Sequence, residues 1–338
     1  MTRTYLPVTK SYKKIKPAEE IVHSFSKSAI TQQHNLSIKG NFTVTSTAPT
    51  GVPIQQLMRM IEKLEVEDSR GVNYWDISGV SLGVLLASRF GVKIQNVDVA
   101  ASGTNADFEL NIPITYGRPT SPNSYDTGMN TYTKDATLNI TLADWEKDGK
   151  LWAANNDFSI DGNTVQVDIT AEQFDVSNAS TVRQRPEDVL MTTLIERPVA
   201  VKQDNAEEEF ELDKGRVFTD LHLIGIEKTT ASGLEVGSYG VFDMENVLKI
   251  HEKDLTGRQT HKVLARHARR FMTEFARQNG SANQTGYLNL SLVHENRGAQ
   301  ARVPTTGVPI NLYMPVKAPA SGKEHKVLVV QDGMFRQD

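Results

Sequence analysis

Alternation of apolar and polar residues with a period of two is the feature that most constrains this fold. Leu36, Ile38, Phe42 and Val44 form one such run, with polar residues between them. Successive side chains of a β-strand point to opposite faces, so a run of this kind buries one face and leaves the other in water. The alternation predicts an all-β protein of antiparallel, half-buried strands, and it recurs at residues 108–116, 138–142, 165–169, 210–212, 221–223, 288–292 and 310–314, with a last buried strand at 326–330.

Helical periodicity is confined to three places. Leu82, Leu85, Leu86 and Phe90 share one helical face, which predicts a short helix over residues 82–90. Another helix is expected to begin at Pro53, a favourable first-turn residue. A longer amphipathic helix is predicted over residues 259–278, with the apolar face Leu264, Ala268, Phe271, Met272 and Phe275. Because strands do not alternate with helices, the pattern argues against a doubly wound sheet or a β/α barrel.

The 338 residues are enough for two domains, and the two halves share a plan of strands, one inserted helix and further strands. We expect an extended basic arm over residues 1–20 and a first β domain over 21–182. A second β domain over 183–338 would contain the helix 259–278. The joint lies in the polar, non-periodic stretch from Val176 to Asp188.

Composition excludes several classes of protein. The chain has 37 Lys and Arg against 41 Asp and Glu, so it lacks the basic excess of a dedicated nucleic-acid binder. The absence of cysteine excludes disulfides, thiolate metal sites and cysteine nucleophiles. The start of the chain has no apolar signal region, and the longest apolar run, around Val80 to Ala87, is far short of the roughly 20 residues that span a bilayer. We therefore expect neither a secretion signal nor a transmembrane span.

One motif suggests catalysis. The run from Gly79 to Gly83, GVSLG, matches the Gly-x-Ser-x-Gly nucleophile elbow of hydrolases, with a strand before it and a helix after it. The elbow follows a buried parallel strand, however, and the preceding residues, NYWD, give a half-polar strand. We favour a strand-to-helix turn with Ser81 near the helix N-cap, where its hydroxyl satisfies a free N–H group. No catalytic residue is assigned.

Charged clusters give candidate interfaces. The basic positions are Arg3, Lys10, Lys13, Lys14 and Lys16 in the arm and Arg266, Arg269 and Arg270 in the helix 259–278. They suit phosphates, acidic lipid head groups or an acidic neighbouring subunit, and the alternative is a solvated charged face. The acidic runs Glu207 to Glu209 and Glu65, Glu67 and Asp68 allow structural calcium at a seam between subunits, but no calcium-loop spacing is present. We assign no cofactor and no metal ligand.

Taken together, this plan resembles the double jelly-roll major capsid proteins of tailless icosahedral viruses. These include internal-membrane bacteriophages such as tectiviruses, corticoviruses and the lipid-containing phages of Flavobacterium, and the adenovirus hexon has a similar plan. The resemblance covers roughly residues 20 to 332. It is carried by the two tandem β domains with inserted helices and by the stretches HNLSIKGNFTVTS, PIQQLMRMIEKLEVEDSRGVNYWDISG and SLGVLLASRF.

The resemblance implies two tandem eight-stranded jelly-roll sandwiches with few helices. Three copies would form a pseudo-hexagonal trimer that tiles an icosahedral shell over an internal membrane. The protein would then be a virion component without enzymatic activity, assembled in the host cytoplasm. Its partners would be other copies of itself, minor capsid or vertex proteins, and the internal membrane through the basic arm, with no sequence-specific nucleic acid.

Two other functions stay open at this stage. A β-sandwich that binds or hydrolyses carbohydrate would use paired carboxylates or exposed aromatic rings, and Asp144, Trp145 and Glu146 are candidates for this role. A phage or cell-surface adhesion protein of tandem β domains would share the same strand pattern without forming a flat trimeric tile.

Overall fold

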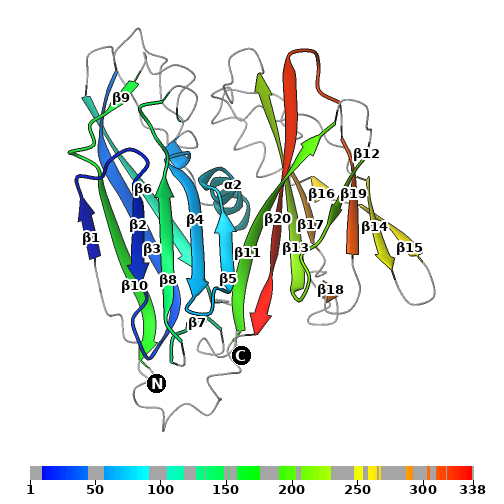
Figure 1. Ribbon diagram of the computed structural model, residues 1–338, viewed down its shortest axis with the longest axis horizontal. Helices are drawn as coiled ribbons and strands as arrows, with labels where there is room; N and C mark the ends of the chain where they lie inside the picture. Colours follow the sequence, from blue (N-terminus) through cyan, green and yellow to red (C-terminus); the bar gives the residue numbers. More distant parts are fainter. Residues whose placement is uncertain are drawn as a thin grey trace. The chain divides into compact units, whose positions relative to one another are not determined.

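The computed structural model describes residues 10–44, 57–90, 105–117, 127–132, 134–147, 151, 158–175, 190–202, 207–229, 247–253, 258–264, 266–267, 287–291, 303–304, 310–316 and 318–336. These residues form mostly antiparallel β-strands, as predicted (Figure 1). The chain divides into two units. The first unit comprises Met1–Val80, Gln95–Thr193 and Met334–Asp338, and the second comprises Ser81–Ile94 and Leu194–Gly333.

The first unit contains two sheets. One sheet has the order β1 (Lys10–Lys13), β10 (Gln166–Asp175), β3 (Ala29–Val44) and β6 (Asn105–Thr115), and the short strands β7 (Met129–Asn130) and β9 (Phe158–Ile160) also pair with β3. The other sheet has the order β5 (Asn73–Ile77), β4 (Ile61–Asp68), β8 (Ala136–Leu142) and β2 (Glu20–Ser24). Each sheet therefore has four main strands.

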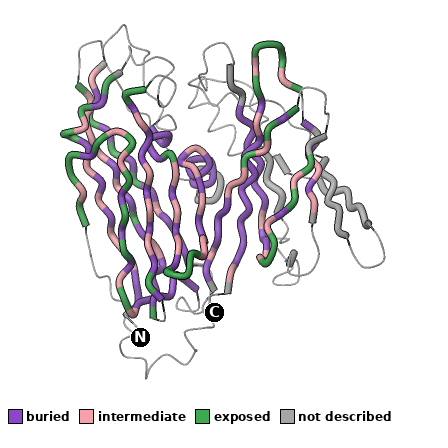
Figure 2. The backbone as a smooth tube through the Cα atoms, viewed as in Figure 1, coloured by how far each residue is buried: buried purple, intermediate pink, exposed green. Residues whose placement is uncertain are grey.

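The register of β3 and β6 shows why these residues form strands. Leu36 lies opposite Ile112 and Ile38 opposite Leu110, and all four side chains are buried. The intervening Ser37 faces the other side of the sheet, where its hydroxyl donates to Glu109 Oε1 at 2.9 Å. Buried and partly exposed residues alternate in the same way along β6 and β8 (Figure 2). The period-two pattern is thus the pattern of burial.

The second unit also contains two groups of paired strands. The first has the order β12 (Glu207–Glu211), β19 (Ile310–Pro315), β14 (Val247–Lys253) and β15 (Arg258–Leu264). The second has the order β16 (Arg266–His267), β17 (Tyr287–Ser291), β13 (Val217–Thr229), β20 (Lys323–Arg336) and β11 (Leu190–Val201), with β18 (Val303–Pro304) also paired to β13.

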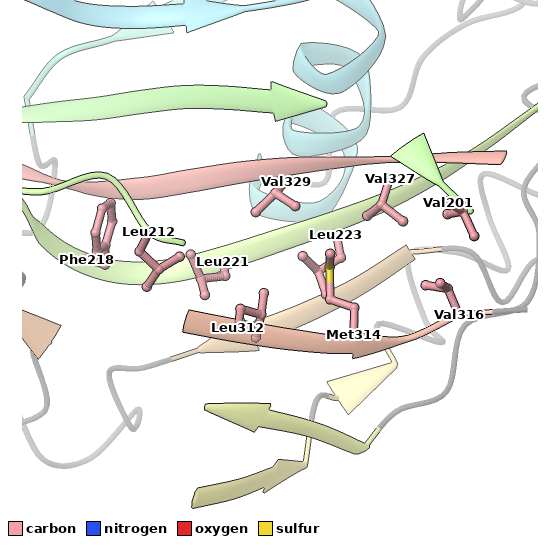
Figure 3. Packing of buried hydrophobic residues seen from close by; sticks show 10 residues of the cluster. All are labelled: Val201, Leu212, Phe218, Leu221, Leu223, Leu312, Met314, Val316, Val327 and Val329. Atoms are coloured by element: carbon pink, nitrogen blue, oxygen red, sulfur yellow. The ribbon is translucent and has the colours of Figure 1, made fainter. Parts of the chain in front are cut away.

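A buried apolar cluster joins these two groups of strands. Leu312 and Met314 of β19 belong to one group, and Leu221 of β13 and Val329 of β20 belong to the other (Figure 3). The remaining members of the cluster are Val201, Leu212, Phe218, Leu223, Val316 and Val327. Since both groups contribute side chains, the second unit is a sandwich with its core between two sheets.

Helix α2 (Gly79–Phe90) confirms the helix predicted over residues 82–90 and begins three residues earlier. Ser78 occupies the N-cap position, so Ser81 lies inside the helix rather than at its cap. The helix expected from Pro53 ends early, because Leu57 and Met58 are helical but β4 begins at Ile61. Residues 51–56 lie outside the described residues.

The helix predicted over residues 259–278 is wrong in its first part. Arg258–Leu264 is strand β15, which pairs with β14, and Arg266–His267 is strand β16, which pairs with β17. The β-branched Thr260 and Val263 suit a strand, and pairing with a neighbouring strand outweighs the helical spacing of the apolar residues. Residues 268–278 lie outside the described residues.

The predicted domain limits differ from the structure in two ways. The predicted arm of residues 1–20 contains strand β1, which belongs to a sheet of the first unit, so residues 10–20 are part of that unit. The division near the middle falls between Thr193 and Leu194, inside β11, and Ser81–Ile94 belong to the second unit. The polar stretch 176–188 proposed as the joint lies outside the described residues.

Gly79 allows the close approach of the chain at the start of α2. A Cβ atom at this position would lie 2.0 Å from the carbonyl oxygen of Met58 and 2.7 Å from that of Ile61. Both contacts are with backbone atoms, which cannot rotate away. We expect Gly79→Ala to lower the free energy of unfolding by about 2 kcal/mol or more, measured by urea unfolding. Val80→Ala at the half-buried next residue is the control and should change it by less than about 1 kcal/mol.

Candidate functional site

The Gly-x-Ser-x-Gly motif forms a structural turn and does not form a nucleophile elbow. Strand β5, which precedes it, runs antiparallel to its neighbour β4, whereas the elbow of α/β-hydrolases follows a parallel strand. Ser81 is fully buried within α2. Gly79 is required by the close backbone contacts described above. The motif therefore reflects packing, and its serine is not exposed to a substrate.

The residues proposed for carbohydrate binding do not form an exposed platform. Trp145 is 3% exposed, so its ring cannot stack on a sugar. Asp144 forms an ion pair with Lys147, with 2.8 Å between Oδ2 and Nζ. Trp75 is also 3% exposed, and its indole N–H donates to the carbonyl of Thr192 at 2.9 Å. Both tryptophans anchor the core of the first unit.

The acidic residues of β4 are held by protein donors. Glu65 accepts from Lys63 at 2.6 Å, and Glu67 accepts from the amide of Asn139 at 3.2 Å. In the part of the chain that the structure describes, no three His, Asp or Glu side chains are arranged to hold a metal ion. The same part contains no helix of sufficient length and apolar character to cross a membrane.

Most of the predicted basic arm is anchored to the first unit. Strand β1 pairs with β10, and its Lys10 and Lys13 are exposed. Lys14 has a φ of 59°, in the left-handed region, and the chain there turns so that Ile15 becomes buried at 2% exposure. The backbone N–H of Lys16 donates to Glu19 Oε2 at 2.6 Å. The segment from residue 10 onward is thus fixed by pairing and burial.

The predicted interface residues are not all brought together. Lys10, Lys13, Lys14 and Lys16 lie on one continuous segment, whereas Arg3 lies outside the described residues. Arg266 is in β16, where it lies opposite Asn289. Arg269 and Arg270 lie outside the described residues, so the predicted basic helix face is not part of the structure described.

Asp168 supports β1 from the neighbouring strand. Its carboxylate accepts from the Ser11 hydroxyl at 2.5 Å and lies 2.8 Å from Lys39 Nζ. Partial burial acts to raise the pKa of Asp168, but hydrogen bonds from Lys39, Ser11 and Gln166 outweigh it and lower the pKa to about 2. The carboxylate is therefore ionised at neutral pH and stabilises the attachment of β1.

A buried ionic cluster, which the sequence did not reveal, holds the turn between β4 and β5. The Asp68 side chain is fully buried, and its Oδ2 accepts from the Tyr74 hydroxyl at 2.8 Å and lies 3.3 Å from Lys134 Nζ. Arg70 adds two further hydrogen bonds from its guanidinium group, at 3.2 and 3.0 Å. Burial raises the pKa of Asp68, but the donated hydrogen bonds of Tyr74 and Arg70 outweigh it and lower the pKa to about 2. The only feature of the sequence that points to this cluster is DSRG, a run of turn-forming residues at positions 68–71.

Two histidines lie in the core between the sheets of the first unit. His23 of β2 and His34 of β3 are 5% and 1% exposed, and their ring centroids are 5.1 Å apart. His34 Nδ1 lies 2.9 Å from the hydroxyl of Tyr116. Burial is the main cause that lowers the pKa of His34 to about 3 and that of His23 to about 4; the charge of Lys10 lowers the latter further. Both imidazoles are therefore neutral at neutral pH.

Comparison with known proteins identifies the fold. No protein-family model matches the sequence, and no curated protein matches it. A chain in the atomic structure of Sulfolobus Turreted Icosahedral Virus is similar at 14% sequence identity with a TM-score of 0.62, covering 97% of this chain and 90% of that one. The PBCV-1 virus capsid contains a chain similar at 9% identity with a TM-score of 0.57, covering 99% and 95%. The major capsid protein P2 from bacteriophage PM2 is similar at 9% identity with a TM-score of 0.52, covering 98% and 99%.

These likenesses extend over nearly the whole of each chain. Both sandwiches therefore lie within the region of structural similarity. The chain therefore has the double jelly-roll fold, which confirms the fold class expected from the sequence.

The buried cluster around Asp68 should be a major determinant of stability. Asp68→Asn leaves Lys134, at 5% side-chain exposure, without its carboxylate partner, and we expect a loss of about 3–5 kcal/mol in the free energy of unfolding. Asp135→Asn is the matched control, because the ion pair of Asp135 with Lys27 is exposed. That change should cost less than about 1 kcal/mol. Equal losses from the two variants in urea unfolding would contradict this assignment.

The two histidines predict a loss of stability in mild acid. Their pKa values are about 3 and 4 in the folded protein but about 6.5 in an unfolded chain, so the unfolded chain binds protons first as the pH falls. The stabilisation is complete above about pH 6.5 and declines below it, by at most about 1.4 kcal/mol per pH unit for each histidine. Urea unfolding between pH 7.5 and 5.5 measures this slope. His34→Gln, which keeps a polar group near Tyr116 but does not titrate, should reduce the slope by about half, and an unchanged slope would show that His34 is not responsible.

Proposed function

We propose that this protein is a major capsid protein, whose copies assemble into the shell of an icosahedral virus. The observation that carries this proposal is the likeness to capsid structures along nine-tenths or more of this chain and of the chains it matches. A local resemblance would fit any β-sandwich, but a match over two tandem sandwiches and their connections is far more restrictive.

The features of the described residues suit a building block better than an enzyme or a lectin. The candidate serine and tryptophan side chains are buried, and the carboxylates that are described are engaged with protein donors. Each unit has its own apolar core between two sheets. Each unit can therefore fold as a sandwich and serve as a structural element of a shell.

We further propose that three copies form a pseudo-hexagonal trimer, in which six jelly rolls surround one axis. Trimers would pack beside one another and beside minor capsid or vertex proteins. The basic positions Arg3, Lys14 and Lys16 would face an internal membrane of the virion, where cationic side chains attract anionic lipid head groups. Assembly would take place in the host cytoplasm.

Light scattering of the purified protein across a concentration series tests the trimer. We expect the mass to reach a plateau at three times the 37.5 kDa chain mass as the concentration rises, and the same particles to show a hexagonal outline in negative stain. A monomer at all concentrations would contradict the capsid proposal, and a glycan-binding screen would then test the carbohydrate alternative.

Truncations separate the two parts of the N-terminal segment. Deletion of residues 1–9 keeps β1 and Ile15, so trimers should persist while binding to anionic vesicles weakens. Deletion of residues 1–18 removes β1 and buried Ile15 and should lower the free energy of unfolding by at least about 2 kcal/mol. Equal stability of the two truncated proteins, measured by urea unfolding, would show that β1 does not contribute to the fold.

A further inference from the structure

Two sheets of this protein end in short strands of opposite charge. β1 is the terminal strand of one sheet of the first unit, and its sequence KSYK contains two lysines in four residues. β12 is the terminal strand of one sheet of the second unit, and its sequence EEEFE contains four glutamates in five residues. Among the described strands, β1 pairs only with β10 and β12 only with β19.

The side chains of β1 are arranged so that its lysines are available to a partner. Ser11 is bound to Asp168, and the Tyr12 hydroxyl donates to the carbonyl of Val22 at 3.0 Å, which fixes the strand against both sheets of the first unit. Lys10 and Lys13 are exposed, and among the described residues neither has a carboxylate within ion-pair distance. The strand is thus held in place by hydrogen bonds. Lys10 Nζ lies over the Tyr12 ring, 5.1 Å from its centroid, and no described carboxylate neutralises either lysine.

β12 is fixed to its own sheet in a comparable way. Phe210 packs against the apolar core of the second unit, which leaves Glu209 and Glu211 on the exposed side of the strand. Glu209 accepts hydrogen bonds from Asn311 at 2.5 Å and from Tyr313 at 2.6 Å. Glu211 contacts Lys214 at 2.9 Å in an exposed pair. Lys214 offsets the charge of Glu211, and the sequence of β12 itself contains four glutamates and no basic residue.

An edge strand offers unpaired backbone N–H and C=O groups to another chain. Pairing of β1 with a second β1 would bring lysines together, and pairing of β12 with a second β12 would bring glutamates together; both are disfavoured because like charges repel across a strand pair. Pairing of β1 with β12 brings opposite charges together. The two strands also have similar lengths, four and five residues.

We propose that β1 of one copy pairs with β12 of a neighbouring copy, so that lysine-rich and glutamate-rich edges join adjacent subunits. This inference rests on the proposed function, since it specifies how copies of the chain contact one another. Each copy supplies one edge of each kind, which makes the interface heterologous. Heterologous interfaces close into rings when the rotation between copies permits, and a ring is the form expected of a trimer.

Charge reversal at each edge, followed by reversal at both, tests this pairing. The first variant is Lys10→Glu with Lys13→Glu, and the second is Glu207→Lys with Glu211→Lys, which spares Glu209 and its two internal hydrogen bonds. The third variant carries all four substitutions. The control is Lys27→Glu with Lys147→Glu, which makes the same charge change as the first variant at two exposed lysines outside β1 and β12.

Light scattering at a series of concentrations and salt levels gives the readout. We expect each single-edge variant to need at least a tenfold higher concentration for half-assembly, and the four-substitution variant to return to within about threefold of the original protein. The control should assemble as the original does. Added salt should weaken assembly of the original and four-substitution proteins, because it screens the paired charges. Urea unfolding of every variant verifies that the subunits remain folded.

Other outcomes have defined meanings. If the original protein does not assemble, the proposed function fails; if it assembles and the edge variants assemble equally well, only the pairing of β1 with β12 is wrong. Folded single-edge variants that fail to assemble, with no recovery when both edges are reversed, would also overturn the pairing. Vesicles of equal parts phosphatidylcholine and phosphatidylglycerol test the lipid alternative. Lys10→Glu with Lys13→Glu that loses vesicle binding but assembles normally would place these lysines against lipid.

Discussion

Every sandwich in this protein depends on burial of the apolar face of one sheet against a second sheet, and this burial determines the rest of the structure. In the first unit the apolar residues of β3 and β6 face the same side, and in the second unit those of β13, β19 and β20 meet in one cluster. Hydrophobic burial of this kind is the main favourable term in folding. The chain therefore forms two sandwiches, each with its own core.

A sandwich of this kind has a packed core between its sheets, but the outer edge of each terminal strand is not covered by another strand of the same sheet. Its terminal strands carry backbone groups without partners, and proteins usually protect such edges with charged residues or with covering segments. Here Tyr12 connects β1 to the carbonyl of Val22 on β2, so the two sheets of the first unit are tied at one side. Charged residues occupy β1 and β12, the terminal strands of two sheets. Charged terminal strands of this kind favour partners of opposite charge and disfavour uncontrolled aggregation.

The sequence predicts the long strands well because a strand that is buried on one face has alternating apolar and polar residues. Leu36 and Ile38 alternate with polar residues, and the structure buries both. Strand β1 was missed because KSYK has no apolar alternation; its pairing depends on Asp168, far along the chain. The helix expected over residues 259–278 was wrong at its start, where β15 pairs with β14. The spacing of apolar residues carries no information about which strands pair. The clusters around Asp68 and His34 were missed because their partners, Lys134 and Tyr116, come from distant parts of the sequence.

The way in which β3 and β6 meet also bears on how far such sequences can drift. Leu36 and Ile112 need only be apolar and of suitable volume, and cores tolerate exchanges among such residues when total volume is kept. Most core positions can therefore change without loss of the fold, provided that the alternation persists. This tolerance is compatible with a shared architecture at 9–14% identity, at which pairwise comparison of the sequences recognises little. In a sandwich of this kind the order of burial along each strand matters more than the identity of the buried residue.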